Sequence, residues 1–216
     1  MKTDPSELLE GPKIGFKIPE VLTVEEIDRI ISAVDMDKKE GQRNRAILET
    51  LYSCGLRVSE LCNLKLSDLY FEEGFIKVEG KGSKQRLVPI SPRAIKEIKY
   101  WLTDRSLGKI KKGYEDYVFL ARWGNNISRI MVFHMIKELA EKTGITKNIS
   151  PHTFRHSFAT HLLEGGANLR AIQCMLGHES IATTEIYTHI DRNMLRSEII
   201  EHHPRNIKYR KERGIY

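Results

Sequence analysis

Residues 151–190 read PHTFRHSFATHLLEGGANLRAIQCMLGHESIATTEIYTHI, and the rest of the chain is interpreted around them. The stretch predicts a helix over 151–164, a glycine turn, and a second helix that Asn168 caps and Gly177 ends. A further helix is expected to begin near Thr183. The pattern therefore favours a mainly helical architecture.

The same stretch carries an unusual combination of chemical groups. His152 and Arg155 are three residues apart in the first turn of a helix, so they share a face where free N–H groups favour an anion. His178 follows the end of the next helix, and Tyr187 supplies a hydroxyl group. Each has an ordinary alternative: solvated first-turn residues, a histidine at a helix C-terminus, or a half-buried tyrosine. Together they combine anion binders, proton carriers and a nucleophile.

The rest of the chain predicts more helices and one β-hairpin. Capping residues, helical periodicity and glycine or proline stops place helices over 23–35, 42–54, 59–64, 92–103, 129–142 and 191–201. Alternating strands over 75–79 and 85–90 surround the tip GKGSK, and residues 117–121 predict a short strand or extended segment. The expected fold class is mainly α with a small antiparallel β-sheet or hairpin, an α+β arrangement.

Two charged residues stand at junctions between these elements. Arg57 lies between two apolar residues at a helix–helix junction, where it either pairs with Glu60 or Asp68 or binds an anion. Lys81 stands at the hairpin tip between two glycines. A lysine there is usually a solvated charge, but the glycines allow close approach to another backbone.

Composition narrows the class of protein. A chain of 216 residues forms one large domain or two small ones, and its net charge of +6 leans toward a polyanionic partner. Three widely spaced cysteines without a CxxC motif favour a reducing compartment. No apolar run of about 18 residues and no signal-peptide pattern is present, so we expect a cytoplasmic protein that does not enter a membrane.

One reaction uses all of these groups, namely attack by a tyrosine hydroxyl on a DNA phosphodiester. Its transition state carries extra negative charge on the non-bridging oxygens, which Arg57 and Arg155 can neutralise. Tyr187 would be the nucleophile. The reaction needs no cofactor and no metal, because the guanidinium pair supplies the electrostatic stabilisation.

The same reaction needs groups that handle protons. A phenol has a pKa of about 10, so His152 can help to manage its proton. A mobile lysine at the hairpin tip, Lys81, can protonate the departing 5′ oxygen, and His178 can hydrogen-bond the phosphate. The sequence leaves open whether Lys81 or His152 protonates the leaving group.

Four stretches in this order resemble the tyrosine recombinase (integrase) family, most closely its Xer-type branch. They are LYSCGLRVSELCNLK (51–65), VEGKGSKQRLVPI (78–90), SPHTFRHSFATHLLEGGANLRAIQCMLGH (150–178) and TTEIYTHI (183–190). The resemblance implies the fold of that family's catalytic domain and a site-specific DNA recombinase that cleaves and rejoins DNA through a 3′-phosphotyrosine intermediate. The site residues that it implies are Arg57, Lys81, His152, Arg155, His178 and Tyr187, with Glu60 orienting the first arginine.

The resemblance also implies an organisation and partners. Residues 1–22 would be a linker arm, 23–201 the catalytic domain and 202–216 a basic C-terminal tail. Family members normally carry a helical core-binding domain ahead of the linker, and we expect that domain to be absent here. The implied partner is double-stranded DNA. The implied assembly is a homo-oligomer, a tetramer on DNA, or a paired recombinase, with exchange of C-terminal tails.

Three other interpretations remain. The first is a metal-dependent hydrolase, because His152 and His156 have a zinc-compatible spacing, but no HExxH motif accompanies them. Residues 151–177 resemble a helix–turn–helix, which allows a DNA-binding regulator without catalysis. A type IB topoisomerase, a nicking-closing enzyme, shares the chemistry and differs only in substrate.

Overall fold

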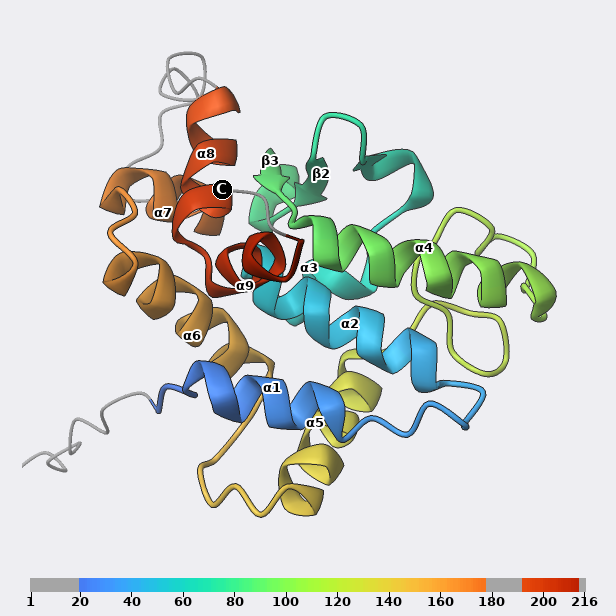
Figure 1. Ribbon diagram of the computed structural model, residues 1–216. Coiled ribbons are helices and arrows are strands. Elements are labelled where there is room, and N and C mark those ends of the chain that lie inside the picture. The colour runs from blue at the N-terminus through green and yellow to red at the C-terminus, as the bar shows by residue number, and fades with distance from the viewer. Residues whose placement is uncertain (1–19, 178–191, 214–216) are drawn as a thin grey trace, which may run out of the picture.

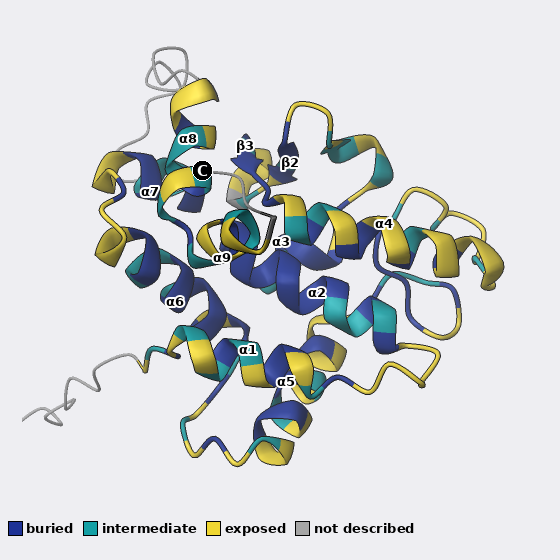
Figure 2. Ribbon diagram, in the orientation of Figure 1, coloured by how far each residue is buried: buried dark blue, intermediate teal, exposed yellow. Residues whose placement is uncertain are grey.

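Helix α2 (Gly41–Cys54) runs through the middle of the molecule, enclosed by other helices (Figure 1, Figure 2). The computed structural model describes residues 20–177 and 192–213. Within them, α2 packs against α4 (Pro92–Leu107) and α6 (Pro151–Glu164), and every residue from 46 to 54 is buried. A helix buried on all sides forms the centre of a core.

Several helices begin where the sequence predicts, because side chains cap their free N–H groups. Thr23 and Glu26 form a complete capping box ahead of α1, and Ser91, Ser128 and Asn168 cap α4, α5 and α7. The remaining helices are α1 (Val24–Ser32), α3 (Val58–Cys62), α5 (Arg129–Lys142), α7 (Leu169–Leu176), α8 (Arg192–His202) and α9 (Pro204–Arg213). Helix α4 runs four residues past its predicted end at 103, to Leu107.

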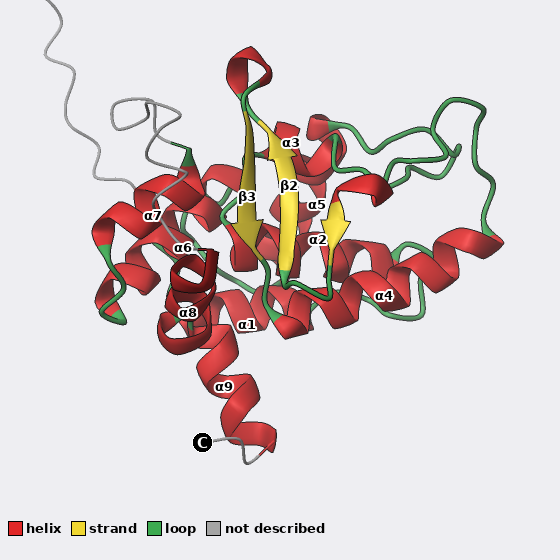
Figure 3. Cartoon of the chain, turned by 90° about the horizontal axis from the view of Figure 1, so that it is seen from above, coloured by secondary structure: helices red, strands yellow, loops and turns green. Residues whose placement is uncertain are grey.

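The sheet has three antiparallel strands in the order β1-β2-β3 (Figure 3). The predicted hairpin forms from β2 (Phe75–Glu79) and β3 (Gln85–Pro89), with Val78 opposite Arg86. Two short 3-10 turns accompany the sheet. The first, η2 (Leu66–Asp68), precedes β1, and the second, η3 (Lys81–Ser83), forms the hairpin tip. The sequence missed β1 (Leu69–Tyr70), because two residues are too few to show alternation. Residues 117–121 make isolated bridges and do not join the sheet.

The C-terminal end differs from the basic tail expected over 202–216. Pro204 begins helix α9 instead of ending structure, since proline suits the first turn of a helix. Arg205 is 1% exposed and pairs with Asp28 and, at 3.1 Å, with Glu49, while its guanidinium lies 5.6 Å from the Tyr52 ring centroid. Residues 204–213 are therefore docked on the body of their own chain.

Next to this ion pair, His203 is completely buried. Its Nε2 donates to the Tyr52 carbonyl at 3.2 Å, and its Nδ1 accepts from the Arg205 N–H at 3.2 Å. Burial is the main cause that lowers the pKa of His203 to about 3. The ring is thus neutral in the folded protein at neutral pH.

This burial predicts acid sensitivity. The unfolded chain binds a proton at His203 near pH 6.5 and the folded chain only near pH 3, so stability is complete above pH 6.5 and falls as the pH drops toward 3. The difference of about 3.5 between these two pKa values corresponds to about 5 kcal/mol. Urea unfolding at pH 7, 5.5 and 4.5 should show a shallower pH dependence in His203→Gln than in the wild type. Equal slopes would show that His203 is not the cause.

The lengths of the helices bear on whether any of them could span a membrane. Within residues 20–177 and 192–213, none of the helices has the length and apolar character that crossing a bilayer needs.

Candidate active site

The C-terminal end of α7 gathers three arginines that are far apart in the sequence. Three successive backbone carbonyls there each accept a hydrogen bond from a different guanidinium. The pairs are Arg86 Nε with Met175 O at 2.8 Å, Arg155 Nη2 with Leu176 O at 2.6 Å and Arg57 Nη2 with Gly177 O at 3.3 Å. Carbonyls at the end of a helix lack intrahelical partners and carry partial negative charge, which suits three cations.

Arg57 is both paired and open to solvent. It stands just before α3, where its N–H donates to Glu60 Oε2 at 2.8 Å and its Nη1 to Glu60 Oε1 at 2.9 Å. Its side chain remains 42% exposed, whereas that of Glu60 is only 1% exposed. The two sequence-based alternatives for Arg57 are therefore compatible: Glu60 holds one edge of the guanidinium, and the rest faces outward.

Arg155 is a buried cation on α6. Its Nη1 donates to the Gly55 carbonyl at 2.6 Å, and its exposed fraction is 9%. Burial, followed by repulsion from Arg57, lowers the pKa of Arg155 to about 10, which still leaves it protonated at pH 7. Gly55 has a φ of +58°, and a Cβ there would lie 2.4 Å from the Phe158 ring, so only glycine fits at this turn.

His152 lies in the first turn of the same helix and is exposed. The sequence predicted that His152 and Arg155 share one face, but Arg155 turns inward to the α7 carbonyls while His152 stays at the surface. His156, the second histidine of the zinc-compatible pair, is half-buried. No group of three or more His, Cys, Asp or Glu side chains suited to a metal ion occurs within residues 20–177 and 192–213.

Three candidate residues fall wholly or partly outside the described part of the chain. The backbone of Lys81 lies at the hairpin tip, in η3, as the sequence predicted. Its side chain lies outside what the structure describes, as do His178 and Tyr187. Helix α7 ends at Leu176 with Gly177 as its C-cap, directly before His178, and the helix predicted to begin near Thr183 also lies outside the described residues.

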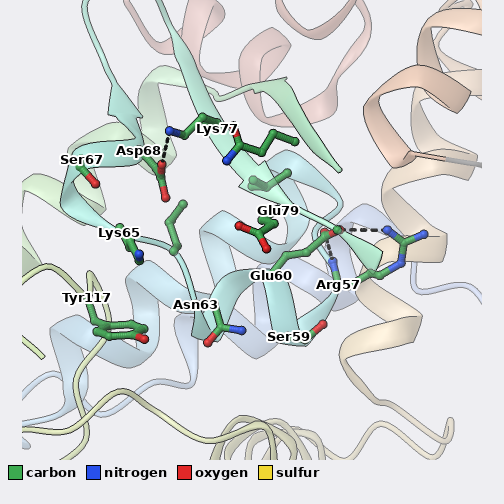
Figure 4. Close-up of a pocket in the computed structure, with 14 residues that line it drawn as sticks. Arg57, Ser59, Glu60, Asn63, Lys65, Ser67, Asp68, Lys77, Glu79 and Tyr117 are labelled. Carbon is green, nitrogen blue, oxygen red and sulfur yellow. Dashed lines mark hydrogen bonds and ion pairs between the residues drawn. The ribbon is translucent and has the colours of Figure 1, made fainter. Parts of the chain in front are cut away.

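A polar groove of about 650 Å³ begins at Arg57 and runs between α3 and β2 toward Tyr117 (Figure 4). Its charged lining is balanced, with three cations and three carboxylates. These are Arg57, Lys65, Lys77, Glu60, Asp68 and Glu79. Lys77 is paired with Asp68 at 3.0 Å. Attraction for an anion is therefore concentrated at the arginines beside α7 and not spread along the groove.

Sequence reasoning missed Arg86, which lies on β3 and is 7% exposed. Its Nη1 and Nη2 donate to the two oxygens of Glu60 at 2.7 and 3.0 Å. Burial alone would raise the pKa of Glu60, but hydrogen bonds and charge from Arg86 and Arg57 outweigh it and lower that pKa. A signal existed in the sequence: Arg86 shares the inward face of its strand with Val88, and a charge in such a row needs a buried partner.

The sequence and the fold are both similar to those of known proteins. The model of the phage integrase family matches residues 20–194. The tyrosine recombinase XerD of Staphylococcus saprophyticus is 44% identical over 202 residues, which cover 94% of this chain and 68% of that protein. The chain belongs to the tyrosine recombinase family. The family consists of enzymes that cleave and rejoin DNA, and this member is Xer-like, as its motifs predicted.

Solved structures of tyrosine recombinases share the fold. The XerA recombinase is 36% identical with a TM-score of 0.68, and the match covers 86% of this chain and 66% of XerA. The XerH recombinase bound to its difH substrate is 30% identical with a TM-score of 0.67, over 80% of this chain and 51% of XerH. The chain thus spans about two thirds of its curated relatives, and the predicted recombinase fold is confirmed.

Proposed function

We propose that this tyrosine recombinase domain cuts and rejoins double-stranded DNA at specific sites through a covalent link between Tyr187 and a 3′ phosphate. The observation that carries the proposal is the cluster at the end of α7, where Arg57 and Arg155 bond adjacent carbonyls, those of Gly177 and Leu176. Two fixed guanidiniums side by side form a site for the non-bridging oxygens of a phosphodiester.

In this mechanism Arg57 and Arg155 stabilise the negative charge of the transition state. When the Tyr187 oxygen attacks phosphorus, negative charge grows on the non-bridging oxygens and the 5′ oxygen leaves. Arg57 would meet this charge from the solvent-facing side, and Arg155 from the buried side, where a low dielectric strengthens the interaction. Both are already oriented by Glu60 and by backbone carbonyls, so little reorganisation is required during reaction.

The remaining candidate residues would transfer protons or bind the phosphate. His152, exposed in the first turn of α6, is suited to assist deprotonation of the Tyr187 hydroxyl. Lys81, on the glycine-flanked hairpin tip, is suited to protonate the departing 5′ oxygen. His178, the residue after the α7 carbonyls, would hydrogen-bond the phosphate.

The proposed assembly is a homo-oligomer on DNA, a tetramer, or a pair with a second recombinase. The similar XerH recombinase was solved bound to its difH substrate, which supports a DNA partner for this chain as well. Tail exchange between subunits would require α9 to leave its own chain, and so to break the ion pairs that Arg205 makes with Asp28 and Glu49.

Strand cleavage on a nicked suicide duplex tests the proposal. Cleavage should release the short downstream fragment and leave protein attached to the 3′ end, in the presence of EDTA as well as in its absence. The DNA should carry a candidate recombination site, and a scrambled duplex of the same length is the control. A stoichiometric complex that binds the site without cleaving it would instead favour the regulator alternative.

DNA affinity should fall steeply with salt. Each phosphate that a lysine or arginine neutralises releases a counterion, so log Kd should rise linearly with log salt with a slope of about 0.9 per contact. Fluorescence anisotropy with a labelled duplex at 50, 100 and 200 mM NaCl measures this slope. A flat dependence would contradict a DNA backbone partner.

A further inference from the structure

Arg86 is a buried arginine whose recorded contacts are with protein groups. Each of its three guanidinium nitrogens donates to a protein acceptor, Nε to the Met175 carbonyl and the two Nη to the carboxylate of Glu60. Its side chain is 5% exposed. Its three hydrogen bonds hold it to protein acceptors on two sides, whereas the Arg57 side chain is 42% exposed and faces solvent.

The backbone packs against this side chain on two sides, most closely at Gly177. Gly177, with a φ of +65°, approaches so nearly that a Cβ there would lie 3.2 Å from Arg86 Cδ and Nε. At the base of the hairpin, a Cβ on Gly80 would lie 3.6 Å from Arg86 Nη1. Arg86 therefore lies between the hairpin that carries Lys81 and the end of α7, and bonds the latter.

Arg86 and Arg57 are linked through one shared acceptor atom. Glu60 Oε1 accepts from Arg86 Nη1 at 2.7 Å and from Arg57 Nη1 at 2.9 Å. Arg86 holds both oxygens of that carboxylate in a fork, which leaves it a single orientation. Arg57, 42% exposed and held by few contacts, depends on that orientation for its own.

We propose that Arg86 is a positioning residue for strand cleavage: it aligns Arg57, through Glu60, with the end of α7, so that Arg57 and Arg155 meet the same phosphate. The proposal rests on the proposed function of the site. Arg86 itself touches no substrate, and its effect is exerted on the negative charge that Arg57 neutralises.

This role makes the effect of Arg86 depend on the charge of the substrate. A methylphosphonate at the scissile position replaces a charged non-bridging oxygen with a methyl group. It therefore removes the negative charge that Arg57 neutralises. Misplacing Arg57 should then matter little. A merely structural loss, by contrast, lowers cleavage of the charged and the neutral ester alike.

The experiment compares single-turnover cleavage of suicide duplexes that carry either ester. Arg86→Lys keeps the positive charge but cannot fork onto a carboxylate and a carbonyl together. We expect about a tenfold to hundredfold lower rate than wild type on the phosphodiester, with unchanged DNA affinity, and a rate within about threefold of wild type on the methylphosphonate. Glu60→Gln, which keeps shape and volume, should show the same selective loss.

The matched control is Arg43→Lys. Arg43 is equally buried, at 8% exposure, but donates to the Leu120 carbonyl and Asn44, away from the α7 end. It should lower thermal stability without selective loss of phosphodiester cleavage. Equal losses on both esters in Arg86→Lys and Glu60→Gln would overturn the positioning role. A wild-type chain that cleaves neither ester would overturn the proposed function, and the positioning role with it.

Discussion

Replacing Tyr187 with phenylalanine should abolish the covalent protein–DNA product. Phenylalanine keeps the ring and removes only the oxygen that would attack phosphorus, so no other step of the reaction is altered. DNA affinity and the unfolding midpoint should stay at wild-type values. Denaturing gel analysis of a labelled suicide duplex would measure the adduct directly.

The chain provides matched controls for this substitution. Tyr100 is 52% exposed on α4, and Tyr70 is 38% exposed at the edge of the sheet, so both residues are accessible. Tyr100→Phe and Tyr70→Phe should both cleave at the wild-type rate. Adduct formation at normal yield by Tyr187→Phe would mean that another residue is the nucleophile.

The second large effect is expected for Arg155→Ala. It removes a transition-state donor, which by analogy costs about 10² to 10³ in cleavage rate. It also leaves the Gly55 and Leu176 carbonyls without their donor, and unsatisfied buried carbonyls cost about 1 to 3 kcal/mol each in stability. Single-turnover cleavage and urea unfolding, measured on the same preparation, separate the two losses.

Arg105 gives the control for the structural part. It is 8% exposed, and like Arg155 it donates to two backbone carbonyls, those of Tyr117 and Glu115. Arg105→Ala should lose comparable stability and keep its cleavage rate below the unfolding midpoint. If both variants lost cleavage rate only in proportion to their loss of stability, Arg155 would have only a structural role.

Local sequence predicted most of the helices, since short-range chemistry determines where they begin and end. The Thr23–Glu26 capping box and Gly55 are set within a few residues of the chain, and both occur as expected. The same holds for the hairpin, where strand alternation brackets the glycine-rich tip. The sequence also identified Arg57, Glu60 and Arg155 as one candidate site, and the structure brings these three together.

What the sequence could not supply depends on distant partners. Arg205 looks like one charge in a basic tail, yet its partner Asp28 is 177 residues away, and the pair buries the start of α9. Arg86 shares the inward row of its strand with Val88, which signals a buried partner but does not say which one. Its acceptor on Met175 is 89 residues away, and only the packing of β3 against α7 brings them together.

The central claim is that Tyr187 becomes joined to the 3′ phosphate at the cleavage site. Trapping the wild-type chain on a suicide duplex, digesting the adduct and sequencing the nucleotide-bearing peptide by mass spectrometry tests it most directly. We predict a single modified peptide with the 3′ phosphate on Tyr187. A link at another residue, or to the 5′ phosphate, would contradict the account.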